Sequence, residues 1–209
     1  LLRLGKINQE RIDRFERMIK QSSKLGSTIA FPVFSYSYTS SEVYNVLTSI
    51  SKTDPISEIL RIRNPNSRTI DPLFSYLVFG EKFSKRHFEV QDYSSFGKRS
   101  LIEELFLKNG YLCAIGGVLN TFTEIHFLEQ TIGIMYRENK FFEGEIIDVN
   151  GEAHLQTIEY YCRNYEYKLR ANASLMAKEL RAEKKIEIWK LEELDFIVEA
   201  IKIQDLYKF

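Results

Sequence analysis

The chain has 209 residues, with 29 Lys plus Arg and 29 Asp plus Glu, so its formal net charge at neutral pH is zero. This balance disfavours nucleic acid or an anionic membrane as the main partner. No apolar run reaches membrane-spanning length, and we expect a cytoplasmic protein with no membrane partner. A chain of this length can bury a substantial core, and we expect a single domain over residues 1–209.

The hydrophobic pattern predicts helices and strands that alternate along the chain. Ile12, Phe15 and Ile19 recur at helical spacing, and Pro32 indicates that a strand is near its end. In chain order we expect a helix over 8–24, a strand over 27–34, a loop over 35–51, a helix over 57–61, a turn over 63–67, a buried strand or part of a helix over 75–80, a helix over 101–107, a buried strand over 111–115, a helix over 123–136, strands over 141–148 and 160–167, a helix over 172–184, a strand over 185–191 and a closing helix over 194–207. The alternation predicts the α/β class, with a central mixed sheet flanked by helices.

The cysteines indicate neither disulfides nor a metal. Cys113 and Cys162 are the only two in the chain, and we expect both to be reduced core thiols. No Cys and His residues are spaced as zinc ligands are. We therefore expect no metal cofactor, and we place His87 and His154 at the surface.

The stretch from residue 94 to residue 129 carries the strongest functional signal. An apolar strand leads into Gly116 and Gly117, and His126 and Glu129 follow at the start of an expected helix that Thr123 caps. Residues three apart on a helix share a face. Imidazole exchanges a proton near neutral pH, and glycine lets a ligand approach the backbone closely. This order of elements is common at active sites on the carboxyl edge of an α/β sheet.

Four blocks of sequence resemble the aminoglycoside 3-N-acetyltransferase family, which moves an acetyl group from acetyl-coenzyme A to an amine on a sugar. They are GSTIAFPVF at 26–34, RTIDPLFS at 68–75, SFGKRS at 95–100 and, over 112–129, an apolar strand followed by T-x-x-H-x-x-E. The match covers roughly the first two thirds of the chain. Residues 1–5 would fit just after the family's His-Ser-Ser-Leu-like start, which implies an incomplete N-terminus.

The resemblance implies a coenzyme A-dependent N-acetyltransferase of that family's α/β fold. His126 is then the general base that removes a proton from the acceptor amine, and Glu129 orients the imidazole or holds the amine. The implied coenzyme A contacts are Ser95, Phe96, Gly97, Ser100, Gly116 and Gly117, and the implied substrate contacts are Arg68, Asp71 and Thr123.

Several of these positions keep a structural alternative. Residues 95–100 are also typical of a turn followed by a helix that Ser100 caps. Arg68, Asp71 and Ser75 are equally compatible with a structural ion pair and cap. Asp71 stands where the family usually has His, which places the acceptor side in question.

The sequence leaves the acceptor and the assembly open. The acceptor amine belongs either to an aminoglycoside or to a nucleotide-linked or cell-surface amino sugar, and a homo-oligomer is not excluded. The alternative function is a non-catalytic coenzyme A- or sugar-binding protein of the same fold. A coenzyme A turnover assay separates the two.

Overall fold

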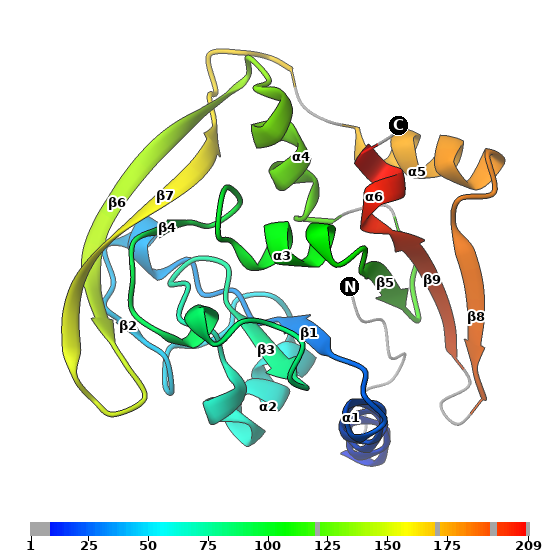
Figure 1. Cartoon of the computed structure of the whole chain (residues 1–209), viewed down its shortest axis with the longest axis horizontal. Coiled ribbons are helices and arrows are strands. Elements are labelled where there is room, and N and C mark those ends of the chain that lie inside the picture. The colour runs from blue at the N-terminus through cyan, green and yellow to red at the C-terminus, as the bar shows by residue number, and fades with distance from the viewer. Residues whose placement is uncertain (1–8, 120–121, 170–171, 193–195, 208–209) are drawn as a thin grey trace.

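Three β-sheets with helices between and around them form the molecule, which confirms the α/β class (Figure 1). The computed structural model describes residues 9–119, 122–169, 172–192 and 196–207. The strands are thus divided among three sheets instead of forming one central sheet. Within the described ranges no helix is both long and apolar enough to cross a bilayer.

The elements follow the expected order with two main differences. The helices are α1 (Gln9–Lys24), α2 (Pro55–Arg63), α3 (Leu101–Leu107), α4 (Ile125–Ile132), α5 (Ala173–Ala182) and α6 (Ile203–Tyr207). The strands are β1 (Ile29–Pro32), β2 (Tyr44–Asn45), β3 (Tyr76–Phe79), β4 (Tyr93–Ser94), β5 (Tyr111–Ile115), β6 (Arg137–Ile147), β7 (Ala153–Arg163), β8 (Glu187–Leu191) and β9 (Phe196–Lys202).

The first difference concerns the C-terminal segment, where the prediction of a long closing helix is wrong. Residues 196–202 form β9, which pairs antiparallel with β5 on one side and β8 on the other, and within the described residues 196–207 only α6 is helical. Four apolar residues of this central strand are buried: Phe196, Val198, Ala200 and Ile201. A short apolar run of this kind suits a buried strand as well as a helix, so periodicity alone does not separate them.

The second difference is that α4 is shorter than expected and β6 is longer. Gly133 adopts a left-handed conformation with φ of 68° and ends α4, so Tyr136 lies outside the helix. Thr123 gives no side-chain cap; its carbonyl oxygen accepts a bond from the backbone N–H of His126 instead. β6 then begins at Arg137, four residues before the expected start, and forms a long curved hairpin with β7 (Figure 1).

The hairpin holds the two shortest strands at its edges. β2 pairs parallel with the end of β6, and β4 pairs parallel with β7, which gives the order β2-β6-β7-β4. α3 and α4 lie between this sheet and the β5-β9-β8 sheet (Figure 1). The loop that follows β4 lies against the first turn of α4.

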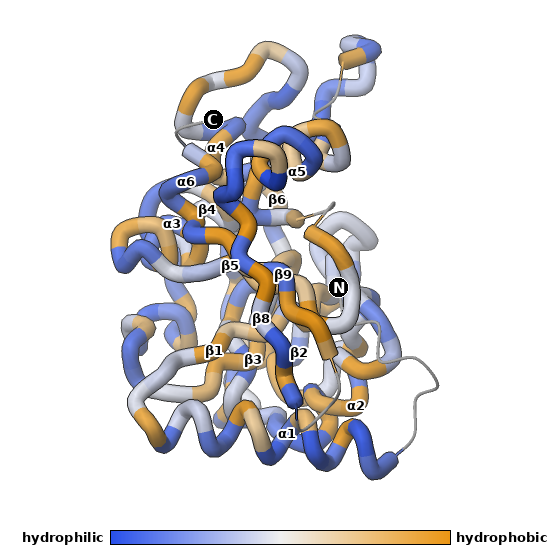
Figure 2. The backbone as a smooth tube through the Cα atoms, turned by 90° about the vertical axis from the view of Figure 1, so that its right-hand side faces the viewer, coloured by the Kyte–Doolittle hydropathy of each residue, from blue (hydrophilic) through white to orange (hydrophobic). Residues whose placement is uncertain are grey.

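Two apolar clusters make the core. In the smaller one, the expected face of α1 packs its buried Ile12, Phe15 and Ile19 around Phe31 and Leu77 of the β1-β3 sheet. Figure 2 shows the corresponding alternation of hydrophobic and hydrophilic residues along α1. The larger cluster lies among the hairpin, α3, α4 and β3, and it includes Phe74 and Phe96.

Arg68 is fully buried between these parts. Its Nε donates to Ser75 Oγ at 3.0 Å, and its Nη2 donates to the carbonyl oxygen of Val33 at 3.0 Å. Its Nη1 donates to the carbonyl oxygen of Ser49, and the guanidinium lies over the ring of Tyr44. A buried charge is tolerated only when its hydrogen-bonding capacity is met in this way.

We expect Arg68→Met to lower the free energy of unfolding by about 3 kcal/mol, because the buried carbonyl acceptors lose their donors. Chemical denaturation monitored by circular dichroism measures the loss. Arg14→Gln, which breaks an exposed pair with Glu10 one turn away on α1, should cost less than about 0.5 kcal/mol. Equal losses of unfolding free energy in the two variants would contradict the conclusion that the buried hydrogen bonds of Arg68 stabilise the fold.

Candidate active site

His126 and Glu129 lie one turn apart on α4, as their spacing predicts. The imidazole Nδ1 of His126 is 2.6 Å from Oε2 of Glu129. An ionised carboxylate only accepts hydrogen bonds, so the geometry assigns the proton to Nδ1 and leaves the lone pair on Nε2. The His126 side chain is 21% exposed, whereas that of Glu129 is 5% exposed. The pair is thus a partly accessible imidazole oriented by a buried carboxylate.

Two further side chains contact Glu129, one by a hydrogen bond and one as an ion pair. The hydroxyl of Tyr136 donates to Oε1 at 2.7 Å, and Nε of Arg137 lies 2.6 Å from Oε2. Burial alone would raise the pKa of Glu129, but the bonds from His126 and Tyr136 and the charge of Arg137 outweigh it, and the pKa is lowered. Glu129 is therefore ionised at neutral pH.

Arg137, at the start of β6, contacts both His126 and Glu129. Its Nη2 lies 3.2 Å from Nε2 of His126, and its Nη1 donates to the carbonyl oxygen of Tyr161 at 2.9 Å. Sequence reasoning missed both Tyr136 and Arg137. The one signal that could have found them is Gly133, which permits a helix end and therefore a strand that starts early and returns past α4.

The loop between β4 and α3 packs against this group. Phe96 is fully buried, and its ring meets the His126 ring edge-on at a centroid distance of 5.2 Å. A Cβ on Gly97 would lie 2.8 Å from Ser94 Oγ and 3.1 Å from Nε2 of Gln130 on α4. Glycine at this position therefore spares the loop close contacts with these two side chains.

The two serines of the loop have structural roles. Ser100 is fully buried, and its hydroxyl accepts from the backbone N–H of Glu103, which confirms the alternative that it caps α3. Ser95 is also buried, and its backbone N–H donates to the carbonyl oxygen of Glu159 on β7. Neither hydroxyl lies at an open surface.

An open cavity of about 360 Å³ borders the same loop. Lys98 and Arg99, both exposed, stand at its rim. Its remaining lining residues are Asp92, Ser94, Phe141, Thr157 and Glu159. The cavity thus combines two cations, two carboxylates and an exposed aromatic ring; its cations are of the type that binds phosphate, and its ring is of the type that packs on a planar group.

Arg68 and Asp71, expected at the substrate, are both enclosed. The carboxylate of Asp71 accepts from the backbone N–H groups of Leu73 and Phe74 at 2.8 and 3.0 Å. Burial raises the pKa of Asp71, although these bonds oppose the change. Its partners make it the cap of the 71–74 turn, and we leave it and Arg68 out of the proposed site.

Gly116 and Gly117, in the turn after β5, differ in their backbone roles. Gly116 has a φ of 66°, which favours glycine, and its N–H already donates to the carbonyl oxygen of Ile197. Gly117 and Thr123 are half-buried. Of the two glycines, Gly116 therefore serves the turn itself.

The predicted placements of Cys113 in the core and of His87 at the surface are wrong. Cys113 lies on the exposed face of β5, because alternate residues of this strand point outward. Desolvation on the sheet and the charge of Glu187 still raise the pKa of its thiol to about 11. His87 is buried, with Nε2 2.8 Å from Oε2 of Glu104.

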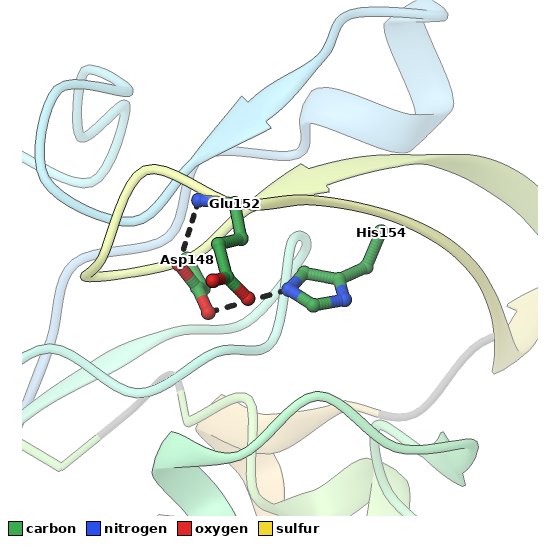
Figure 3. Close-up of side chains that lie close together, drawn as sticks. All are labelled: Asp148, Glu152 and His154. Atoms are coloured by element: carbon green, nitrogen blue, oxygen red, sulfur yellow. Dashed lines mark hydrogen bonds and ion pairs between the residues drawn. The ribbon is translucent and has the colours of Figure 1, made fainter.

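A second group of titratable side chains lies at the turn of the β6–β7 hairpin (Figure 3). Asp148, Glu152 and His154 converge there, with Nε2 of His154 3.2 Å from Oδ2 of Asp148. Oδ1 of Asp148 accepts from the backbone N–H groups of Asn150 and Glu152. These bonds close the turn and account for the group without a ligand.

The family model for aminoglycoside 3-N-acetyltransferases matches residues 30–195, and the chain belongs to this family. Sisomicin-bound AAC-VIa is similar in structure, with a TM-score of 0.75 and 15% identity over 98% of this chain and 84% of that one. The YokD protein from Bacillus subtilis gives a TM-score of 0.70 at 17% identity, covering 98% and 85%. AAC-IIIb in its binary complex with CoASH gives 0.59 at 19% identity, covering 77% and 60%. No curated protein matches in sequence.

We expect Glu129→Gln to be less stable than the parent by about 2 kcal/mol at pH 7, because charge-assisted bonds are lost. The pKa of Glu129 is lowered by folding, so its stabilisation is present above its unfolded value of about 4.3 and is lost as pH falls through the lower folded value. Urea unfolding at pH 7, 5 and 3 should show the difference between the two proteins shrinking below pH 5. A constant difference would contradict this assignment.

Proposed function

We propose that the protein transfers an acetyl group from acetyl-coenzyme A to the amine of an amino sugar, with His126 as general base. The observation that carries the proposal is the His126–Glu129 pair, in which a buried carboxylate binds Nδ1 and leaves Nε2 as the basic atom. Membership of the acetyltransferase family supports the reaction class.

A sugar ammonium must lose a proton before its nitrogen can attack a carbonyl carbon. Nε2 of His126 accepts that proton, and the Glu129 carboxylate stabilises the imidazolium that results. The acetyl thioester supplies the activated acyl group: a C–N bond forms and the C–S bond breaks. We propose direct transfer, because the raised pKa of the Cys113 thiol makes it a poor nucleophile.

On the donor side, the chain offers the cavity beside the 94–100 loop. Lys98 and Arg99 would contact phosphate groups, and Gly97 lets the backbone lie close to α4. Ser95, Phe96 and Ser100, expected to contact coenzyme A, are buried and would support the loop from within. Gly117 stays a candidate backbone contact.

The acceptor is proposed as an amino sugar, either an aminoglycoside or a nucleotide-linked amino sugar of the cytoplasm. One structural neighbour is bound to sisomicin and another to a gentamicin, which supports the class at the level of the family. Both acceptor types therefore belong in the turnover assay.

Coenzyme A should raise the melting temperature of the protein in a saturable way, because a ligand selective for the folded state stabilises it. The double variant Lys98→Gln/Arg99→Gln should bind coenzyme A roughly tenfold more weakly by calorimetry, since two phosphate contacts are lost. Lys190→Gln on β8 removes an exposed charge elsewhere and should bind as the parent does. Equal weakening in this control would show that total charge, and not the cavity, determines binding.

His126→Ala should lower kcat by about 10²–10⁴ and leave the Kd for coenzyme A unchanged, because the base acts only on the acceptor amine. Glu129→Gln should cost less, since it keeps the shape of the pair. Initial rates of thiol release at saturating acetyl-coenzyme A and acceptor measure both. Coenzyme A binding without turnover of either acceptor type would favour the non-catalytic binding protein instead.

A further inference from the structure

Arg137 touches both members of the His126–Glu129 pair. Its Nε is 2.6 Å from Glu129 Oε2, and its Nη2 is 3.2 Å from His126 Nε2. Its third arm, Nη1, donates to the carbonyl oxygen of Tyr161 on β7, and the side chain is only 10% exposed. Three contacts on two elements, α4 and β7, thus hold the guanidinium against the imidazole.

The direction of the hydrogen bond between Arg137 and Nε2 of His126 follows from the chemistry of the two groups. A guanidinium has donors and no acceptor, so Arg137 donates to the lone pair of His126 Nε2. That lone pair is the one that must receive the proton of the acceptor. The positive charge of Arg137 opposes formation of the imidazolium, whereas the negative charge of Glu129 favours it.

We propose that Arg137 is the positioning residue that keeps His126 a neutral base and occupies Nε2 until an acceptor ammonium replaces it. The inference rests on the proposed general-base role of His126. An ammonium N–H can take the place of the guanidinium N–H at Nε2 without loss of a hydrogen bond. Its proton then passes to Nε2, which leaves a neutral amine and an imidazolium bound to the Glu129 carboxylate.

The tyrosines nearest this site are neutral, and the carboxylate of Glu124 binds elsewhere. Burial raises the pKa values of Tyr136 and Tyr160 to about 12, and burial also raises that of Tyr161, so all three are neutral. The carboxylate of Glu124, on the turn before α4, accepts from the hydroxyl of Tyr76. Among the described residues, the charged groups in contact with the imidazole are therefore Glu129 and Arg137.

The first test follows the titration of the three histidines by NMR and needs no turnover, with His126→Ala assigning the resonance. In Arg137→Gln the Glu129 charge is unopposed, so the His126 midpoint should move to higher pH by roughly one unit. Arg137→Lys keeps the charge and should stay near the parent. Lys140→Gln removes an exposed charge from the same strand and should leave the midpoint unchanged.

The second test is the pH profile of kcat/KM. The acid limb of Arg137→Gln should shift upward with the His126 midpoint, and its rate should approach that of the parent at high pH. A residue that only supports the fold would lower the rate equally at all pH values, and that result would overturn the proposal.

An unchanged His126 midpoint in a folded Arg137→Gln protein, or an equal shift in Arg137→Lys, would also overturn it. Melting temperatures establish folding, and Arg137→Met, which keeps the aliphatic stem, is the second charge-removing variant. If no acceptor is acetylated but the midpoint shifts, the general-base function fails while the control of His126 by Arg137 stands.

Discussion

The buried guanidinium of Arg68 is the constraint on which the frame of this molecule depends. Its donors end on the carbonyl oxygens of Val33, Val46 and Ser49 and on the hydroxyl of Ser75. Because each buried polar group left unpaired costs about 1–3 kcal/mol, these segments cannot separate one at a time. The loop they hold carries β2, which pairs with β6. One side chain therefore links the β1-β3 sheet to the hairpin that supplies Arg137.

A series of aromatic contacts connects the segments held by Arg68 to the candidate site. Asp71 accepts from the backbone N–H of Phe74, whose ring lies 5.2 Å from that of Phe34 and 4.5 Å from that of Phe96. Phe96 in turn meets His126 edge-on. Rings in a close-packed core cannot shift independently. This chain of contacts therefore fixes the position of the His126 imidazole on the side that faces Phe96. Asp71 thus contributes to this chain of contacts through the turn that holds Phe74.

The parts of the structure that depend on neighbours in sequence could be predicted, and those that depend on distant partners could not. Helix periodicity found α1 and α3, and three-residue spacing found the contact between His126 and Glu129. The strand over 196–202 was mistaken for a helix because a short apolar run fits either form, and its pairing with β5, far back in the chain, leaves no local signal. Arg137 was missed for a similar reason. Its approach to Nε2 requires the end of α4, which Gly133 permits, and also the return of β6 past the helix, which no motif encodes.

The balance of charge around His126 bears on which ligands the site can select. A carboxylate beside an imidazole favours its charged form, which cannot act as a base, whereas a neighbouring cation disfavours that form. Arg137 offsets that charge, so the Glu129–Arg137 pair presents no net charge to an incoming amine. On the proposed function, such a site would recognise one ammonium by hydrogen bonding at Nε2, and it would gain little from further positive charges on the same ligand. On the proposed function, preference for a polycation over a sugar with a single amine must come from carboxylates outside this group, because Glu129 and Arg137 together carry no net charge.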